Sequence, residues 1–167
     1  MPTIRLQRKL HVPADLAAGV LGDILQAIAQ RQGPWRGFAL HVGLGDLHLP
    51  DVGYVAVPIN LNAKRVDEKH AFEIEFSAEH LPSAFPTFTG TLSLEPGAIG
   101  ESSLHLDGSY DLPMQVFGVL IDKALMPHVA IKSLENLIGE LASACEARVD
   151  QREADYAQYH FYSYLHQ

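Results

Sequence analysis

The chain has 167 residues, 47% of them hydrophobic and 19% charged, which suits one domain with a substantial apolar core. Acidic residues outnumber basic ones by 20 to 12, and the resulting formal charge of -8 excludes nucleic acid and anionic lipid surfaces as expected partners. No secretory signal is recognised and no run of about 18 apolar residues exists, so we expect a cytoplasmic protein without membrane insertion.

The first predicted element is a half-buried strand over residues 3–12. Its alternating pattern places four apolar side chains on one face: Ile4, Leu6, Leu10 and Val12. Arg8 falls on that same face. Pro13 ends the strand, and Asp15 is well placed to cap a helix that Gly33 and Pro34 would stop. The apolar residues that this helix carries are Leu16, Val20, Ile24 and Ile28.

A series of antiparallel strands is predicted next, because the connections are too short for parallel crossovers. The pattern indicates strands over residues 35–42, 55–61, 72–76, 88–94 and 104–110, with 47–49 as a further candidate. Pro58 lies inside one of them, which predicts an edge strand or a bulge at that position.

A long helical segment opens at Pro113, and Pro127 predicts a break near Met126 that divides a short helix from the main one. Apolar residues of the main helix recur every three or four positions: Leu134, Leu137, Ile138, Leu141 and Cys145. Cys145 is the only cysteine, so no internal disulfide forms. Its place on the apolar stripe favours a small buried side chain over a nucleophile.

This order of elements resembles the helix-grip fold of the START, Bet v 1 and polyketide-cyclase superfamily, often called SRPBCC. The resemblance rests mainly on the final hairpin, which ends in Gly108, Ser109, Tyr110, Asp111, Leu112 and Pro113, and on the helix that begins with Val116, Phe117 and Gly118. It implies an α+β fold in which a curved antiparallel sheet of six to seven strands wraps around a long C-terminal helix. The expected domain covers residues 1–149.

The resemblance also implies an apolar cavity between the sheet and the last helix. The side chains expected to bind a lipid- or polyketide-like molecule there are Phe72, Ile74, Phe88, Leu92, Leu104, Leu106 and Tyr110 from the sheet, and Phe117, Leu134, Ile138 and Leu141 from the helix. Periodicity assigns residues to a face without showing a void, so a filled core remains the alternative. Arg8 and Tyr110 are the polar groups expected to orient such a ligand. Arg8 could instead reach solvent at an open end.

Motifs for cofactors and catalysis are incomplete, so no cofactor, metal or catalytic residue is expected. Gly43 and Gly45 begin a dinucleotide-type loop whose third glycine is replaced by His48. Two other sets of possible metal ligands, Asp67 with His70 and Asp46 with His48 and Asp51, do not make a closed site. Glu73 and Glu75 alternate with apolar residues and are expected to face solvent.

The remaining stretch, residues 150–167, is an aromatic-rich extension outside the family outline. It carries Tyr156, Tyr159, Phe161, Tyr162 and Tyr164. It could continue the last helix, cover the sheet, or dock on a second copy as a homodimer. Three functions stay open: a binder of an apolar small molecule, a cyclase or dehydratase acting in the same cavity, and a self-associating protein with a filled core. For the enzyme, Arg8, Tyr110 and His105 are the candidate polar groups, although His105 is expected to face outward.

Overall fold

The computed structural model describes residues 2–43, 53–66, 70–80, 86–111 and 126–165. Along the chain these contain β1 (Thr3–Leu10), α1 (Ala14–Ala29), a short 3₁₀ turn η1 (Gly33–Trp35), β2 (Ala39–Gly43), β3 (Tyr54–Val66), β4 (Ala71–Ala78), β5 (Thr87–Pro96), β6 (Ser102–Asp111) and α2 (Met126–Leu165). None of the helices within these ranges has a stretch both long and apolar enough to cross a lipid bilayer.

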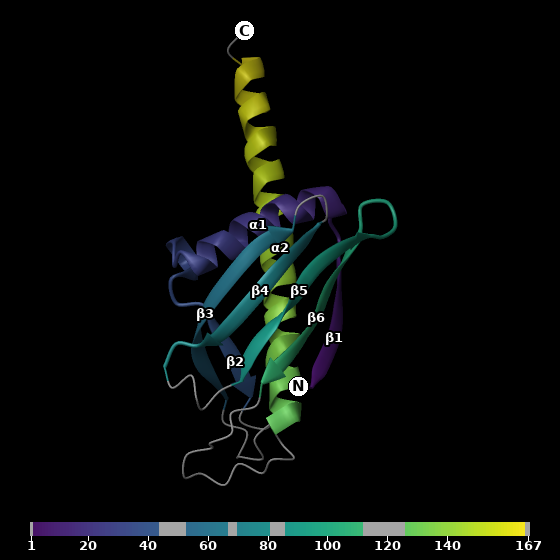
Figure 1. Cartoon of the computed structure of the whole chain (residues 1–167). Helices are drawn as coiled ribbons and strands as arrows, with labels where there is room; N and C mark the ends of the chain where they lie inside the picture. Colours follow the sequence, from purple (N-terminus) through teal and green to yellow (C-terminus); the bar gives the residue numbers. More distant parts are fainter. Residues whose placement is uncertain (1, 44–52, 67–69, 81–85, 112–125, 166–167) are drawn as a thin grey trace.

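The six strands form one antiparallel sheet in the order β1-β6-β5-β4-β3-β2. The sheet curls around α2, which approaches both edge strands, β1 and β2, and also packs against α1 (Figure 1). The backbones of the central strands β4 and β5 lie farther from α2 than those of the edges do. The expected α+β helix-grip fold is therefore confirmed.

Strand β3 changes partner at Pro58. Residues 54–58 pair with β2, whereas residues 59–66 pair with β4. The missing N–H of Pro58 therefore falls where one ladder ends and the other begins, and its carbonyl accepts a hydrogen bond from the Glu79 N–H at 2.8 Å. The prediction of an edge strand was wrong for β3 as a whole, because it lies one strand in from the edge. Each half of β3 nevertheless has a ladder partner on one side only.

Helix α1 begins one residue earlier than its predicted cap. Its N-cap is Pro13, without a capping side chain, and Asp15 lies in the first turn. There the carboxylate of Asp15 lies 2.8 Å from Nε2 of His70, which joins α1 to the β3–β4 connection. Leu16 is 39% exposed, while the buried face of α1 consists of Ala14, Ala17, Ala18, Val20, Leu21, Ile24, Leu25 and Ile28.

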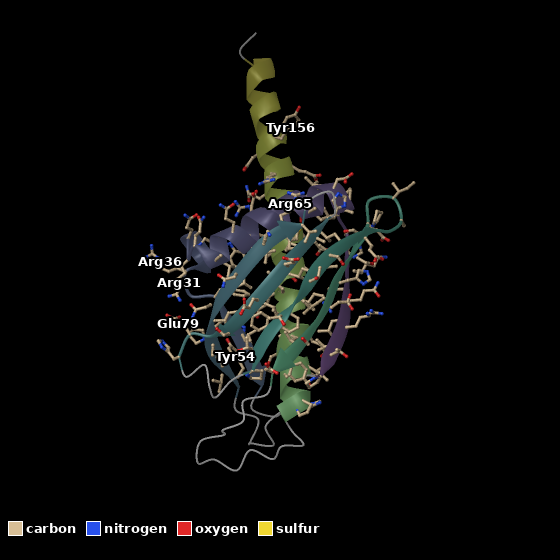
Figure 2. All side chains as sticks on the ribbon, in the orientation of Figure 1. Arg31, Arg36, Tyr54, Arg65, Glu79 and Tyr156 are labelled. Atoms are coloured by element: carbon tan, nitrogen blue, oxygen red, sulfur yellow. The ribbon has the colours of Figure 1, made fainter. Side chains whose placement is uncertain are left out.

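The end of α1 also differs from the prediction. The helix ends at Ala29, four residues before Gly33, and Arg31 adopts a positive φ of 53°. The Arg31 guanidinium donates hydrogen bonds to Glu79 at 2.9 Å and to Asn60 at 2.6 Å, which compensates for this backbone conformation (Figure 2). The strand predicted over residues 35–42 is correspondingly shorter, because η1 and the following turn carry the chain to Ala39.

Helix α2 begins at Met126, so Pro127 occupies its first turn, where a backbone N–H has no helical partner. The predicted apolar stripe is buried: Leu134, Leu137, Ile138, Leu141 and Cys145. The helix continues to Leu165 and projects beyond the sheet (Figure 1). The short helix expected from Val116 and the strand candidate at 47–49 lie outside the described residues.

Candidate functional site

The expected ligand-binding side chains of the sheet lie together in the interior. Each is at most 3% exposed: Phe72, Ile74, Phe88, Leu92, Leu104, Leu106 and Tyr110. From α2, Leu134, Ile138 and Leu141 are equally buried, and all of these residues belong to one apolar cluster. Phe117 lies outside the described residues. The surfaces that the sheet and α2 turn towards each other are therefore continuous and predominantly hydrocarbon.

An aromatic pair lies at the centre of this surface. The rings of Phe76 and Phe88 stack with centroids 5.1 Å apart and planes inclined by 21°. Gly90 and Gly108 are paired on neighbouring strands, and a Cβ atom on Gly108 would meet Cζ of Phe88 at 2.5 Å. The two glycines thus leave room for the Phe88 ring to lie against the sheet backbone. Phe76 completes this arrangement and was not among the expected site residues, although its alternation with Phe72 and Ile74 indicates the same face.

Helix α1 supplies a wall that sequence reasoning missed. A Cβ atom on Gly22 of α1 would lie 3.3 Å from Cε1 of Phe72, so this ring packs against α1. The guanidinium carbon of Arg65 lies 5.7 Å from the centroid of the same ring. Phe72 is therefore held at the end of the sheet that α1 covers. The sequence predicted an amphipathic helix here without indicating which end of the sheet it covers.

Arg8 is exposed, unlike its apolar neighbours. It pairs with Leu104 in the β1–β6 ladder, and so shares the strand face of that buried residue. Because β1 is an edge strand, a long side chain on this face can extend past the sheet into solvent. The structure therefore places the Arg8 guanidinium at the rim of the grip.

The outer face of the sheet is polar, as expected for Glu73 and Glu75, which are both exposed. His105 also faces outward and helps to line an open hollow of about 470 Å³, together with Arg5, Leu6, Gln7, Glu95 and Asp107. Its Nε2 atom is buried and makes no hydrogen bond, although Oε2 of Glu95 lies 3.5 Å away. His105 is thus separated by the thickness of the sheet from the apolar interior.

Ion pairs on the surface shift two pKa values. A hydrogen bond from Lys9 lowers the pKa of Glu101, and hydrogen bonding to Asp107 raises the pKa of the Arg5 guanidinium. Both pairs join β1 to the β5–β6 hairpin on the exposed side. These shifts stabilise the charged forms of Arg5 and Glu101.

Cys145 is a buried structural side chain. It is 1% exposed, and burial together with the charge of Glu146 raises its thiol pKa to about 11. Its sulfur lies 3.6 Å from the carbonyl oxygen of Ala17, at the contact between α2 and α1. A thiol held in its protonated form is a poor nucleophile.

Candidate metal ligands do not gather in the described part of the chain. Within it, no group of three or more His, Cys, Asp or Glu side chains is arranged to hold a metal ion. Asp46, His48, Asp51 and Asp67 lie outside the described residues. His70 is bound to Asp15, as noted for α1.

The sequence matches no protein-family model and no curated protein. Solved structures are nevertheless similar over most of their length. The ZhuI aromatase/cyclase from Streptomyces sp. R1128 is 14% identical with a TM-score of 0.54, covering 89% of this chain and 95% of its own. Ara h 8.0201 is 11% identical with a TM-score of 0.54, covering 90% of this chain and 98% of its own.

A third similar structure is norcoclaurine synthase from Thalictrum flavum, in complex with dopamine and hydroxybenzaldehyde. It is 13% identical with a TM-score of 0.53, covering 90% of this chain and 87% of its own. The proteins in these comparisons have SRPBCC-type folds. The chain therefore shares the helix-grip fold of these proteins, and at this level of identity the comparisons establish the fold alone.

Proposed function

We propose that the protein binds an apolar small molecule, of lipid- or polyketide-like character, between the curved sheet and α2. The observation that carries this proposal is the position of α2, which approaches the two edges of the sheet more closely than its centre. The side chains between helix and central strands are almost entirely apolar. A straight helix packed across a curved sheet leaves a space that side chains or a ligand must fill.

The proposed lining consists of the described residues expected from the sequence: Phe72, Ile74, Phe88, Leu92, Leu104, Leu106, Tyr110, Leu134, Ile138 and Leu141. The similar norcoclaurine synthase holds aromatic molecules of one ring in its complex, and the similar ZhuI protein is an aromatase/cyclase. Both names support a ligand with a ring system for this chain as well.

A pair of tryptophan substitutions on α2 tests the proposal. Ile138 is 3% exposed and faces the interior, whereas Ile131 is 37% exposed on the same helix and serves as the matched control. If ligand space exists, Ile138→Trp abolishes uptake of a fluorescent apolar dye while the free energy of unfolding changes little. If side chains already fill the space, overpacking destabilises Ile138→Trp by about 1–3 kcal/mol, and the proposal fails.

The natural ligand is accessible to a direct measurement. Native mass spectrometry of protein purified from its own host is expected to detect a co-purifying apolar molecule, and Ile138→Trp protein is expected to lack it. A wild-type mass equal to that of the bare polypeptide, in every preparation, would argue against the proposal.

For a ligand with an anionic end, we propose Arg8 as its contact at the rim. Arg8→Ala is then expected to weaken binding of a fatty acid about tenfold, in the range of a charge-assisted hydrogen bond. Arg5→Ala is the control, because Arg5 pairs with Asp107 on the outer face. Equal affinities in the two variants would remove Arg8 from the site.

We further propose that the projecting part of α2 docks on a second copy of the chain. Among the residues whose burial is described, Val149 is the last buried one; the helix runs on to Leu165, and Tyr156 is 68% exposed on it. Tyrosine is common at protein interfaces, because it combines an apolar ring with a hydrogen-bonding hydroxyl. A homodimer would cover this aromatic-rich stretch.

A further inference from the structure

A polar cluster joins the edge strand β2 to the flank of α2. Nδ1 of His41 lies 2.6 Å from Oε1 of Glu140, and the backbone carbonyl of His41 accepts a hydrogen bond from Nδ2 of Asn136 at 3.0 Å. The ring of Tyr54 on β3 meets the imidazole edge to face, with centroids 4.9 Å apart and planes inclined by 82°. The imidazole of His41 is therefore held by Glu140 and Tyr54, and its backbone by Asn136.

The contact through Nδ1 determines what His41 can do. A carboxylate accepts hydrogen bonds, so Nδ1 carries the proton that it donates to Glu140. In the neutral imidazole Nε2 then has a free lone pair. Within the described part of the chain, the His41 side chain makes its hydrogen bond through Nδ1, which leaves Nε2 for another donor.

The other described imidazole–carboxylate pairs are arranged differently. His70 and His105 face their partners, Asp15 and Glu95, through Nε2. His11 uses Nδ1 towards Glu101, but at 3.6 Å and with 73% of its side chain exposed. Only His41, among these four, combines a short Nδ1 contact with partial burial and a ring packed on its side.

The cluster borders the apolar interior and is reachable from outside. Glu140 lies on α2 between the buried residues Leu137 and Leu141. The side chains of His41 and Glu140 are 34% and 39% exposed. Tyr54 lies beside them, at the lower end of the sheet in Figure 2. The cluster therefore lies at the boundary between solvent and the apolar interior.

We propose that Nε2 of His41 is the acceptor for an acidic hydroxyl group, phenolic or enolic, on an otherwise apolar ligand, and that Glu140 is the residue that positions it. This inference rests on the proposed function, since it assigns the polar end of the same ligand. The hydroxyl O–H donates to Nε2. When the proton transfers, the O–H bond breaks, an Nε2–H bond forms, and the ligand oxyanion remains beside an imidazolium paired with Glu140.

Two probes of the same ring system separate this site from general apolar binding. Binding of 2-naphthol and of naphthalene is measured with wild-type protein and with His41→Leu. We expect wild-type protein to prefer the naphthol by about 2- to 10-fold, the worth of one hydrogen bond, and His41→Leu to lose this preference while it still binds naphthalene.

Glu140→Gln tests the positioning role with nearly the same side-chain volume. A neutral amide can accept from Nδ1 or donate to it, so the tautomer is no longer fixed and the preference for naphthol is expected to fall. Glu135→Gln is the matched control, because Glu135 is an exposed residue of α2 that pairs with Lys132. This control is expected to retain the wild-type preference.

Each result has one meaning. An unchanged naphthol preference in both His41→Leu and Glu140→Gln would overturn the His41 site while leaving the proposed function intact. Failure of wild-type protein to bind either probe would count against the proposed function and this inference together. Circular dichroism of each variant verifies the fold, and Glu140→Gln decides the matter if His41→Leu does not fold.

Discussion

Gly90 and Gly108 are positions where the sheet has no room for even one carbon atom. A Cβ atom on Gly108 would lie 2.5 Å from both Cζ of Phe88 and the carbonyl oxygen of Thr89. Gly139, on α2, is the opposite case, since a Cβ there would have no neighbour within 4 Å. A change of Gly to Ala should therefore have opposite effects on the free energy of unfolding at Gly108 and at Gly139.

We expect Gly108→Ala to lower the free energy of unfolding by about 1–3 kcal/mol, because the Phe88 ring and the strand must move apart. Gly139→Ala should raise it by up to about 1 kcal/mol, through helix propensity. Urea unfolding measures both. A neutral Gly108→Ala would contradict the packing around Phe88, and destabilisation by Gly139→Ala would contradict the open space beside Gly139.

Cys145 gives the stability a defined pH dependence. Its pKa is raised from 9.0 in the unfolded chain to about 11 in the folded protein, chiefly by burial. The unfolded state therefore loses the proton first, and the contribution of Cys145 to stability is fully present below pH 9 and is lost as the pH rises towards 11.

We expect the difference in unfolding free energy between wild type and Cys145→Ala to shrink across this range. Other groups that titrate between pH 9 and 11 are present in both proteins, so their effect cancels in this difference. A difference that stays constant from pH 8 to 11 would mean that the thiol is not buried. In the native protein at pH 8, iodoacetamide should leave Cys145 unmodified, whereas unfolded protein should react.

For single residues, the sequence predicted which face of a strand or helix most side chains occupy. It predicted little about the groups that each side chain contacts. Alternation predicted that Ile74, Phe88 and Leu106 would be buried, because period two assigns a side chain to a face. The same rule gave Arg8 an inward face, yet Arg8 is exposed, since β1 proves to be an edge strand. Edge position depends on strand order, which periodicity does not contain.

Among the secondary-structure elements, the turn from β1 into α1 depends on one buried hydroxyl. Ser102 of β6 is 1% exposed, and its Oγ donates to the backbone carbonyl of Val12 at 2.7 Å. Val12 lies in the connection that leads into α1. This hydrogen bond therefore ties the start of α1 to the β5–β6 hairpin.

Ser102→Ala should destabilise the protein by about 1–3 kcal/mol, because the Val12 carbonyl stays buried and loses this donor. Ser103→Ala is the control. Its hydroxyl contacts Gln7 on the outer face, so we expect a change within about 0.5 kcal/mol. Thermal unfolding compares the two. Equal midpoints would show that water replaces the Ser102 hydroxyl.

Elements were easier to predict than their junctions. The hairpin of β5 and β6 and the apolar stripe of α2 follow from patterns within 10 to 20 residues. The cap of α1 and the start of β2 differ from expectation. At the start of α1, for example, Asp15 contacts His70, which is distant in sequence. The pairing of His41 with Glu140 spans 99 residues of sequence, and no local pattern indicates it.

For the molecule as a whole, α2 is both the core helix and the extension. It runs unbroken from Met126 to Leu165, and its described side chains from Asp150 to Tyr156 are exposed. Beyond the sheet, one described ion pair still ties it to the domain, between Arg152 and Asp23 at 2.8 Å. The domain of residues 1–149 remains a prediction that truncation can test.

Deleting residues 150–167 should leave a folded protein whose stability changes by no more than about 1 kcal/mol, the typical limit for an exposed ion pair. Its molar mass by light scattering should fall from that of a dimer to that of a monomer. Full-length Arg152→Ala, which loses only the ion pair, should remain dimeric. An unchanged mass after truncation would refute the homodimer.

The change of partner within β3 has a mechanical consequence for the sheet. The strand pair formed by β2 and residues 54–58 is joined at Pro58 to the rest of the sheet by the continuing peptide chain, with few hydrogen bonds across the boundary. The amides of residues 39–43 and 54–58 should therefore exchange with deuterium before those of β5 and β6.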